Sequence, residues 1–181
     1  MTETMIAVIG GSGIYDIDGL DDATWTTVET PWGAPSDQIL TGRLDGVKMA
    51  FLPRHGRGHR IPPTDVPARA NIYALKSLGV ERIVSISAVG SLTAQISPLD
   101  LVVPDQIIDR TKGRPSTFFD SGIAVHVGFA DPFCPQLSEA LATAAREQPV
   151  ASHVGGTYLV IEGPQFSTRA ESELYRSWGC S

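Results

Sequence analysis

The chain has 181 residues, of which 42% are hydrophobic and 19% are charged, and its formal net charge is -6. This length suits one domain, and the acidic balance argues against a nucleic-acid partner because binding to phosphate backbones normally needs a basic face. No apolar run approaches the roughly 18 residues of a membrane span, and the first four residues lack the basic start of a secretory signal. Cys134 and Cys180 lack C-x-x-C spacing and indicate reduced thiols, so we expect a cytoplasmic protein without a membrane partner.

The first predicted strand, over residues 6–9, runs directly into a glycine-rich turn at residues 10–13. An uninterrupted apolar run closed by glycines is typical of a strand buried on both faces. The glycines let backbone N–H groups converge on an anion, and the hydroxyl of Ser12 adds a donor. The turn fits neither a dinucleotide fingerprint, which needs glycine where Asp16 stands, nor a P-loop. The turn therefore indicates an anion site but no particular cofactor. The alternative is an ordinary tight turn after a core strand.

A hairpin is predicted next. Residues 16–46 are rich in turn formers and contain one possible strand at 38–42. Asp45-Gly46 is a strong signal for a tight hairpin turn, and it leads into a second buried strand over residues 47–52. We therefore expect this hairpin to follow a stretch made mostly of turns.

The second strand enters residues 53–60, the most basic segment of this acidic chain. A helix is predicted over residues 67–78, with a proline in its first turn, where the missing N–H does no harm, and with Gly79 as its stop. A third strand is predicted at residues 82–87. The apolar positions expected on one face of the helix recur every third residue: Ile72, Leu75 and Leu78.

The second half of the chain contains shorter elements. Further strands are predicted at residues 99–104, 106–109 and 157–162. Residues 113–135 have little periodicity and predict a long functional loop. A helix is expected over residues 136–148 with these residues on one face: Leu137, Ala140, Leu141, Ala144 and Ala145. A final helix begins at Thr168, where Thr168 and Glu171 form a capping box, and ends before Gly179.

Buried strands that alternate with helices predict an α/β fold: a single domain with a central mixed, largely parallel sheet flanked by helices. Ligands of such sheets bind beyond the carboxyl ends of the strands. Three loops that follow predicted strands carry polar groups suited to an anion: Ser12, Arg54, His55, Ser87 and the backbone of Ala88. We therefore expect these three loops to share one ligand.

Inorganic phosphate is a ligand that such loops could hold without a metal. Hydrogen bonds to a charged group contribute roughly 1.5–3 kcal/mol each, and millimolar binding needs only about 4 kcal/mol. Taken singly, Arg54 is more simply a solvated surface arginine and His55 a structural histidine; the coincidence of three strand ends favours the functional interpretation. The four histidines show no H-E-x-x-H spacing, so we expect no metal site. The sequence also lacks the G-x-S-x-G elbow of a serine hydrolase, which argues against that class of enzyme.

Residues 161–171 add an aromatic face to this candidate site. Phe166 could stack on a planar ring, and Ser167 could hydrogen-bond the edge of that ring. The alternative is an ordinary turn between a strand and a helix, with Phe166 packed in the core. The residues alone leave both interpretations open.

Six motifs, in order along almost the whole chain, resemble those of the methylthioadenosine phosphorylases, in the trimeric branch of the purine nucleoside phosphorylase family. They are VIGGSG at 8–13, RHG at 54–56, NIYALK at 71–76, SAVGS at 87–91, DQIIDRT at 105–111 and IEGPQFSTRAE at 161–171. The resemblance implies phosphorolysis of 5′-methylthioadenosine by phosphate to adenine and 5-methylthioribose-1-phosphate, in purine salvage. It implies no cofactor, since inorganic phosphate is a co-substrate, and a homotrimer in the complete protein.

The resemblance also implies a role for each matching residue. The phosphate site comprises Ser12, Arg54, His55, Ser87 and Ala88, the last through its backbone N–H. The substrate site comprises Pro63 in the pocket lining, Phe166 on the purine, Ser167 beside it, and His126, which reaches the 5′ end of the substrate in the adjacent subunit.

One departure separates this chain from the family. The family continues by about a third, through a methionine under the ribose and an aspartate that protonates the purine, so we expect residues 1–181 to be a fragment whose catalytic acid lies past Ser181. Alternatives are a 6-oxopurine nucleoside or methylthioinosine phosphorylase, a nucleosidase that uses water, and an inactive fragment. Ser167 favours methylthioadenosine, because the 6-oxopurine-preferring relatives carry glutamate there.

Overall fold

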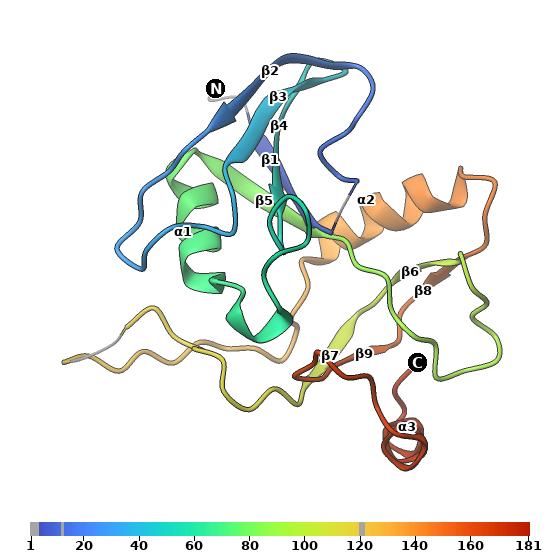
Figure 1. Ribbon diagram of the computed structural model, residues 1–181. Helices are drawn as coiled ribbons and strands as arrows, with labels where there is room; N and C mark the ends of the chain where they lie inside the picture. Colours follow the sequence, from blue (N-terminus) through green and yellow to red (C-terminus); the bar gives the residue numbers. More distant parts are fainter. Residues whose placement is uncertain (1–3, 12, 120–121) are drawn as a thin grey trace. The chain divides into compact units, whose positions relative to one another are not determined.

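The computed structural model describes residues 4–11, 13–119 and 122–181 (Figure 1). The chain divides into two compact units, Met1–Ala88 with Pro115–Phe118, and Val89–Arg114 with Phe119–Ser181. Both units combine strands and helices, which confirms the predicted α/β class. Within the described residues, no helix has the length and apolar character that crossing a membrane requires.

The first unit is built on a five-stranded sheet with the order β2-β3-β4-β1-β5 (Figure 1). The central strand β1 pairs in parallel with β4 and β5, whereas the β2–β3 and β3–β4 pairs are antiparallel. The sheet is therefore mixed, as predicted. Its strands are β1 (Met5–Gly10), β2 (Leu20–Thr26), β3 (Ile39–Leu44), β4 (Val47–Pro53) and β5 (Val80–Ser85).

Strand β2 was not predicted from the sequence, and its position explains why. It lies at the edge of the sheet and pairs with β3. Its sequence, LDDATWT, is mostly exposed and carries no apolar alternation, which is the signal that sequence analysis depends on. The expectation that the chain before β3 consists mostly of turns was therefore wrong for these seven residues.

The predicted hairpin is confirmed. Leu44 of β3 lies opposite Val47 of β4, so two residues make the turn. Both of them have positive φ, 49° for Asp45 and 79° for Gly46, as a two-residue type I′ turn requires.

Helix α1 (Ala68–Ser77) supplies part of the hydrophobic core of the first unit. The buried residues of the helix are Ala70, Asn71, Ala74 and Leu75. Two of them, Ala74 and Leu75, form the core with residues of the sheet: Ala7, Ile9, Ile39, Ala50, Leu52 and Val80. The predicted face was wrong at Ile72, whose side chain is 38% exposed. Steps of three residues drift around a 3.6-residue helix, and the small alanines form the stripe that meets the core. Pro67 is the N-cap residue, and Gly79, with φ of 90°, ends the helix as predicted.

The second unit contains two pairs of short parallel strands, β6–β8 and β7–β9, and two helices. Strand β8 was not predicted, because its sequence, SHV, contains no apolar run, unlike that of the equally short β6. The elements are β6 (Leu101–Val103), β7 (Gln106–Asp109), α2 (Pro135–Arg146), β8 (Ser152–Val154), β9 (Thr157–Val160) and α3 (Arg169–Ser177). The described residues between 113 and 134 form no helix or strand, as expected of the long loop.

The two helices of the second unit test the predicted faces and caps. In α2 the buried residues are Ala142 and Ala145, while Ala140 and Ala144 of the predicted face are exposed, so the inner face is rotated from the predicted one. In α3 the capping box is confirmed: the amide of Glu171 donates to the Thr168 hydroxyl at 3.2 Å, and the amide of Thr168 donates to the Glu171 carboxylate at 2.7 Å.

Candidate functional site

The carboxyl ends of β1, β4 and β5 lie together at one edge of the sheet of the first unit (Figure 1). The amide of Arg54, just after β4, donates to the carbonyl of Gly10 at 2.7 Å, and the amide of Ile86, just after β5, donates to the carbonyl of Ile9 at 2.8 Å. Parallel pairing on both sides of β1 thus brings three loops together that lie far apart in the sequence.

Arg54 spans two of these loops. Its Nη1 donates to the carbonyl oxygen of Ile86 at 3.3 Å, and its Nε lies 3.3 Å from Nε2 of His55. The side chain is half-buried. The guanidinium is therefore held at the sheet edge beside the start of the loop that contains Ser87, where it can receive an anion.

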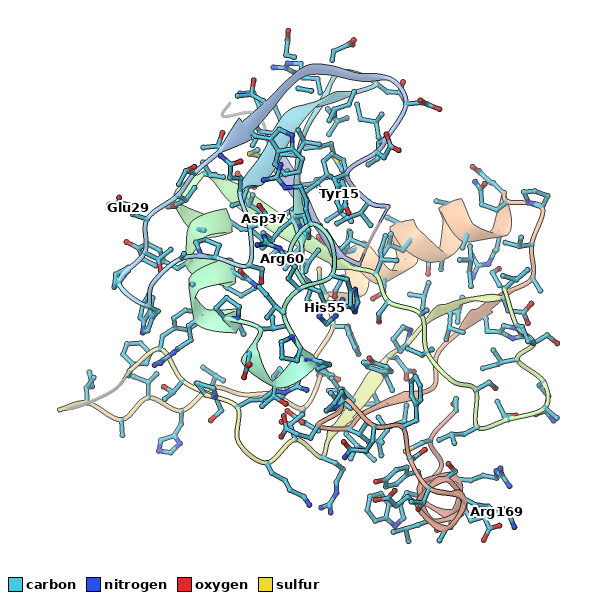
Figure 2. The ribbon with its side chains drawn as sticks, viewed as in Figure 1. Tyr15, Glu29, Asp37, His55, Arg60 and Arg169 are labelled. Carbon is cyan, nitrogen blue, oxygen red and sulfur yellow. The ribbon has the colours of Figure 1, made fainter. Side chains whose placement is uncertain are left out.

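His55 is buried, and one of its ring nitrogens is committed to the backbone (Figure 2). Its Nδ1 lies 2.8 Å from the carbonyl oxygen of Ile61; because a carbonyl only accepts, Nδ1 carries the hydrogen. Nε2 then presents a lone pair toward Arg54. Burial lowers the pKa of the His55 imidazole below its ordinary value of 6.5; the hydrogen bond to Ile61 opposes that shift, and the nearby charges of Arg54 and His59 add to it. His55 is neutral at neutral pH.

We expect stability to fall as the pH drops below about 6.5, because the unfolded chain then binds a proton that the folded His55 resists. Above that pH both states hold neutral imidazole, and this stability is fully present. Below it, the free energy of unfolding declines by at most about 1.4 kcal/mol per pH unit for one proton until the lowered folded pKa is reached. Urea unfolding of the wild type and of His55→Gln measures this. A difference between them that does not change with pH contradicts the assignment.

Of the three remaining candidates for the phosphate site, the structure describes two. Ser12 lies outside the described residues. Ser87 and Ala88 follow Ile86 directly and are exposed. The structure therefore brings Arg54 and His55 together at the strand ends, next to the loop that carries the other two.

The other two arginines of the basic segment are already paired, which no pattern in the sequence indicated. Nη2 of Arg57 lies 2.8 Å from Oδ1 of Asp37, and Nη2 of Arg60 lies 3.7 Å from Oδ2 of the same carboxylate (Figure 2). Among the described residues, Arg54 is the arginine of this segment that has no carboxylate partner. The aspartate lies twenty positions away from Arg57 in a turn, so no local pattern could have revealed the pairing.

In the second unit, Glu162 anchors the segment that carries Phe166 and Ser167. Its carboxylate accepts hydrogen bonds from the amide of Lys112 at 2.5 Å, the amide of Gly113 at 3.2 Å and Nε of Arg114 at 2.9 Å. Those bonds lower the pKa of the Glu162 carboxyl, the Lys112 amide most of all.

Phe166 is 91% exposed, so the alternative that it packs in the core is wrong, and its ring is available to a ligand. The hydroxyl of Ser167 lies 2.8 Å from that of Ser172 in α3. In the first unit, Pro63 begins a short 3-10 turn, Pro63–Asp65, and is partly exposed. His126, in the long loop, is exposed.

Comparison with known proteins gives a consistent result. The family model for the phosphorylase superfamily matches residues 5–181. An S-methyl-5′-thioadenosine phosphorylase from Cereibacter sphaeroides is 64% identical over 98% of this chain and 61% of its own length. One from Geobacter sulfurreducens is 59% identical over 99% of this chain and 63% of its own length. The chain thus spans about three fifths of the length of these curated relatives.

Solved structures show the same likeness. A methylthioadenosine phosphorylase from an antarctic soil metagenomic library superposes with a TM-score of 0.94 at 53% identity, covering 99% of this chain and 64% of that one. A methylthioadenosine phosphorylase from Schistosoma mansoni, in complex with adenine, superposes with a TM-score of 0.92 at 36% identity, covering 98% of this chain and 72% of that one.

Proposed function

We propose that this chain, which belongs to the phosphorylase superfamily, carries the phosphate and purine subsites of a 5′-methylthioadenosine phosphorylase. The reaction splits 5′-methylthioadenosine with inorganic phosphate into adenine and 5-methylthioribose-1-phosphate. The observation that carries the assignment is the meeting of the β1, β4 and β5 ends around Arg54, whose guanidinium has no carboxylate partner in the described chain. We propose that residues 1–181 belong to one nucleoside phosphorylase domain.

The phosphate subsite comprises Arg54 and His55 with Ser12, Ser87 and the Ala88 amide. A phosphate oxygen forms a bond to the anomeric carbon of the ribose while the bond from that carbon to the purine nitrogen breaks. Positive charge develops on the sugar, and the bound phosphate stabilises it electrostatically. Neutral His55 accepts a hydrogen bond from Nε of Arg54 through Nε2 and so orients the guanidinium, while Arg54 supplies the charge that holds the phosphate. The proton that the leaving purine takes up is assigned to no residue of this chain.

In the second unit, the exposed ring of Phe166 and the neighbouring Ser167 form the purine subsite. Pro63 of the first unit is proposed separately as a residue that contacts the substrate. The Schistosoma mansoni relative is described in complex with adenine, which supports a 6-aminopurine as the leaving group. The hydroxyl of Ser167 can donate to the unprotonated N1 of a 6-aminopurine, whereas a carboxylate only accepts and therefore suits the N1–H donor of a 6-oxopurine. No cofactor is required, because phosphate is itself the second substrate.

We also propose a homotrimer in which His126 serves the site of an adjacent subunit. The chain around it supports an interface, because four apolar side chains at alternate positions are exposed. They are Ile123, at 61%, Val125, at 45%, Val127, at 77%, and Phe129, at 67%. A solvated loop gains nothing from such a pattern, whereas contact with another subunit would bury it. Sedimentation velocity gives the mass of the assembly; a monomer at micromolar concentration contradicts the trimer.

The function is tested by incubating the chain with 5′-methylthioadenosine, with and without phosphate, and measuring adenine release. We expect release only with phosphate, together with 5-methylthioribose-1-phosphate. Release without phosphate would identify a nucleosidase, and release from 6-oxopurine nucleosides alone would identify the other substrate class. Calorimetric titration with inorganic phosphate tests the subsite separately. Phosphate binding without release would identify residues 1–181 as a binding fragment that is inactive alone.

A further inference from the structure

The carboxylate of Asp37 lies just behind the loop that carries Arg54 and His55, and its side chain is only 6% exposed (Figure 2). Its Oδ2 accepts a hydrogen bond from the backbone amide of Arg57 at 2.7 Å. Its Oδ1 accepts from Nε and Nη2 of the same arginine at 3.2 and 2.8 Å. One carboxylate therefore fixes both the main chain and the side chain of a residue three positions after Arg54.

The main chain before Asp37 is itself fixed from helix α1. The side chain of Asn71 accepts a hydrogen bond from the amide of Ser36 at 2.8 Å and donates one to its hydroxyl at 2.9 Å. Asn71 and Ser36 are 3% and 5% exposed, so these bonds are shielded from water. A continuous chain of buried contacts thus runs from α1 through Ser36 and Asp37 to the loop after β4.

The loop after β4 also lies close to the main chain of Ser36. A Cβ at Gly56 would lie 3.0 Å from the carbonyl oxygen of Ser36. On the other side, the guanidinium of Arg57 lies over the ring of Trp25, 4.1 Å from its centroid, which blocks the arginine from turning away. The ring of Trp25 in turn meets that of Tyr15, with centroids 6.2 Å apart. The loop is held on both sides.

We propose that Asp37 is the positioning residue of the phosphate site: it holds Arg57 and Arg60 in place and thereby fixes the loop so that Arg54 points to the strand ends. This role rests on the phosphate subsite proposed above. Asp37 itself does not touch phosphate, because its negative charge would repel it and its oxygens are occupied by Arg57. Without this carboxylate, the main chain and the side chain of Arg57 would lose their partner, and the loop would lose its fixed orientation.

Asp37→Asn tests this role, since it keeps the shape of the side chain and removes its charge. We expect the dissociation constant for inorganic phosphate, measured by calorimetric titration of the full chain, to rise about tenfold, a size typical of losing an outer partner that orients a ligand group. Arg57→Met, which keeps the long apolar stem, should have a similar effect. The double variant should bind phosphate no more weakly than either single variant, because the two residues act as one unit.

A matched control separates positioning from simple stability. Asp100 is also a shielded carboxylate, 13% exposed, and accepts hydrogen bonds from Nε2 of His153 and the amide of Ser97, both at 2.8 Å. Asp100→Asn should lower the unfolding temperature without changing the phosphate dissociation constant. A merely structural role for Asp37 would reduce the fraction of chains that bind, seen as a lower stoichiometry, and leave the dissociation constant of the folded fraction unchanged.

The outcomes distinguish the positioning role of Asp37 from the phosphate subsite itself. An unchanged dissociation constant in Asp37→Asn, with phosphate still bound by the wild type, overturns the positioning role alone. A wild type that binds no phosphate overturns the proposed phosphate subsite and the positioning role with it. An equal rise in Asp100→Asn also counts against positioning, because the effect would then follow any loss of stability.

Discussion

Arg54→Ala is expected to raise the dissociation constant for inorganic phosphate by roughly 10- to 150-fold, the equivalent of one charged hydrogen bond of about 1.5–3 kcal/mol. The guanidinium lies at the sheet edge beside the carbonyl of Ile86 and the ring of His55, and the two other arginines of its segment are tied to Asp37. Neither of these two arginines is therefore ready to replace it. Calorimetric titration gives the constant, and the phosphate dependence of adenine release gives the matching KM.

Two further variants make this result specific. Arg54→Lys keeps the charge but loses the planar pair of donors, so its phosphate affinity should fall between those of the wild type and the alanine variant. Arg146→Ala removes an arginine that is 54% exposed and lies 3.7 Å from Glu139 in α2, and it should leave phosphate affinity unchanged. If Arg54→Ala binds phosphate as the wild type does, Arg54 is a solvated surface arginine and the phosphate subsite is misplaced.

The largest effect on stability is expected from Gly56→Ala. Gly56 has φ of 69°, in the left-handed region that costs other residues about 1–2 kcal/mol. The added Cβ would also lie 3.0 Å from the carbonyl oxygen of Ser36, a backbone atom that cannot move aside, and overpacking of this kind costs about 1–3 kcal/mol more. We expect a total loss of roughly 2–5 kcal/mol in urea unfolding, and weaker phosphate binding because His55 is displaced.

Gly58 offers the matched comparison two residues further on. Its φ is 79°, but a Cβ there would meet only Cγ of Arg60, at an ordinary 3.8 Å. Gly58→Ala should therefore lose about 1–2 kcal/mol, the backbone cost alone. The difference between the two variants measures the close approach to Ser36. Equal losses would mean that the loop is not pressed against this support.

The sequence predicts those parts of this protein that local physics specifies. The apolar run before Gly10 predicted strand β1, although Ala7 and Ile9 are buried while the alternate residues are only half-buried. The Asp45-Gly46 pair predicted the turn that joins the antiparallel strands β3 and β4. The capping box at Thr168 needed no tertiary information. Because strand ends of a parallel sheet share an edge, the predicted loops around Arg54 came together as a consequence of topology.

What the sequence did not predict depends on contacts between distant residues. Edge strand β2 carries no apolar alternation, since most of its side chains face water. The inner face of α1 is formed by two alanines, Leu75 and one asparagine, and the burial of the asparagine depends on its bonds to Ser36 and not on its hydropathy. The support from Asp37 to Arg57 spans twenty positions, and neither residue belongs to a motif. The support behind the site was thus less predictable than the groups that face the ligand.

The tight turn at Asp45-Gly46 has a practical consequence for experiments on this protein. It lies at the opposite end of β4 from Arg54, and a strand of seven residues separates the two by roughly 20 Å. A fluorescent probe attached there would report on unfolding without disturbing the ligand groups. The same turn is a natural place to open the chain for permutation, because its neighbouring strands are already held by their ladder of hydrogen bonds.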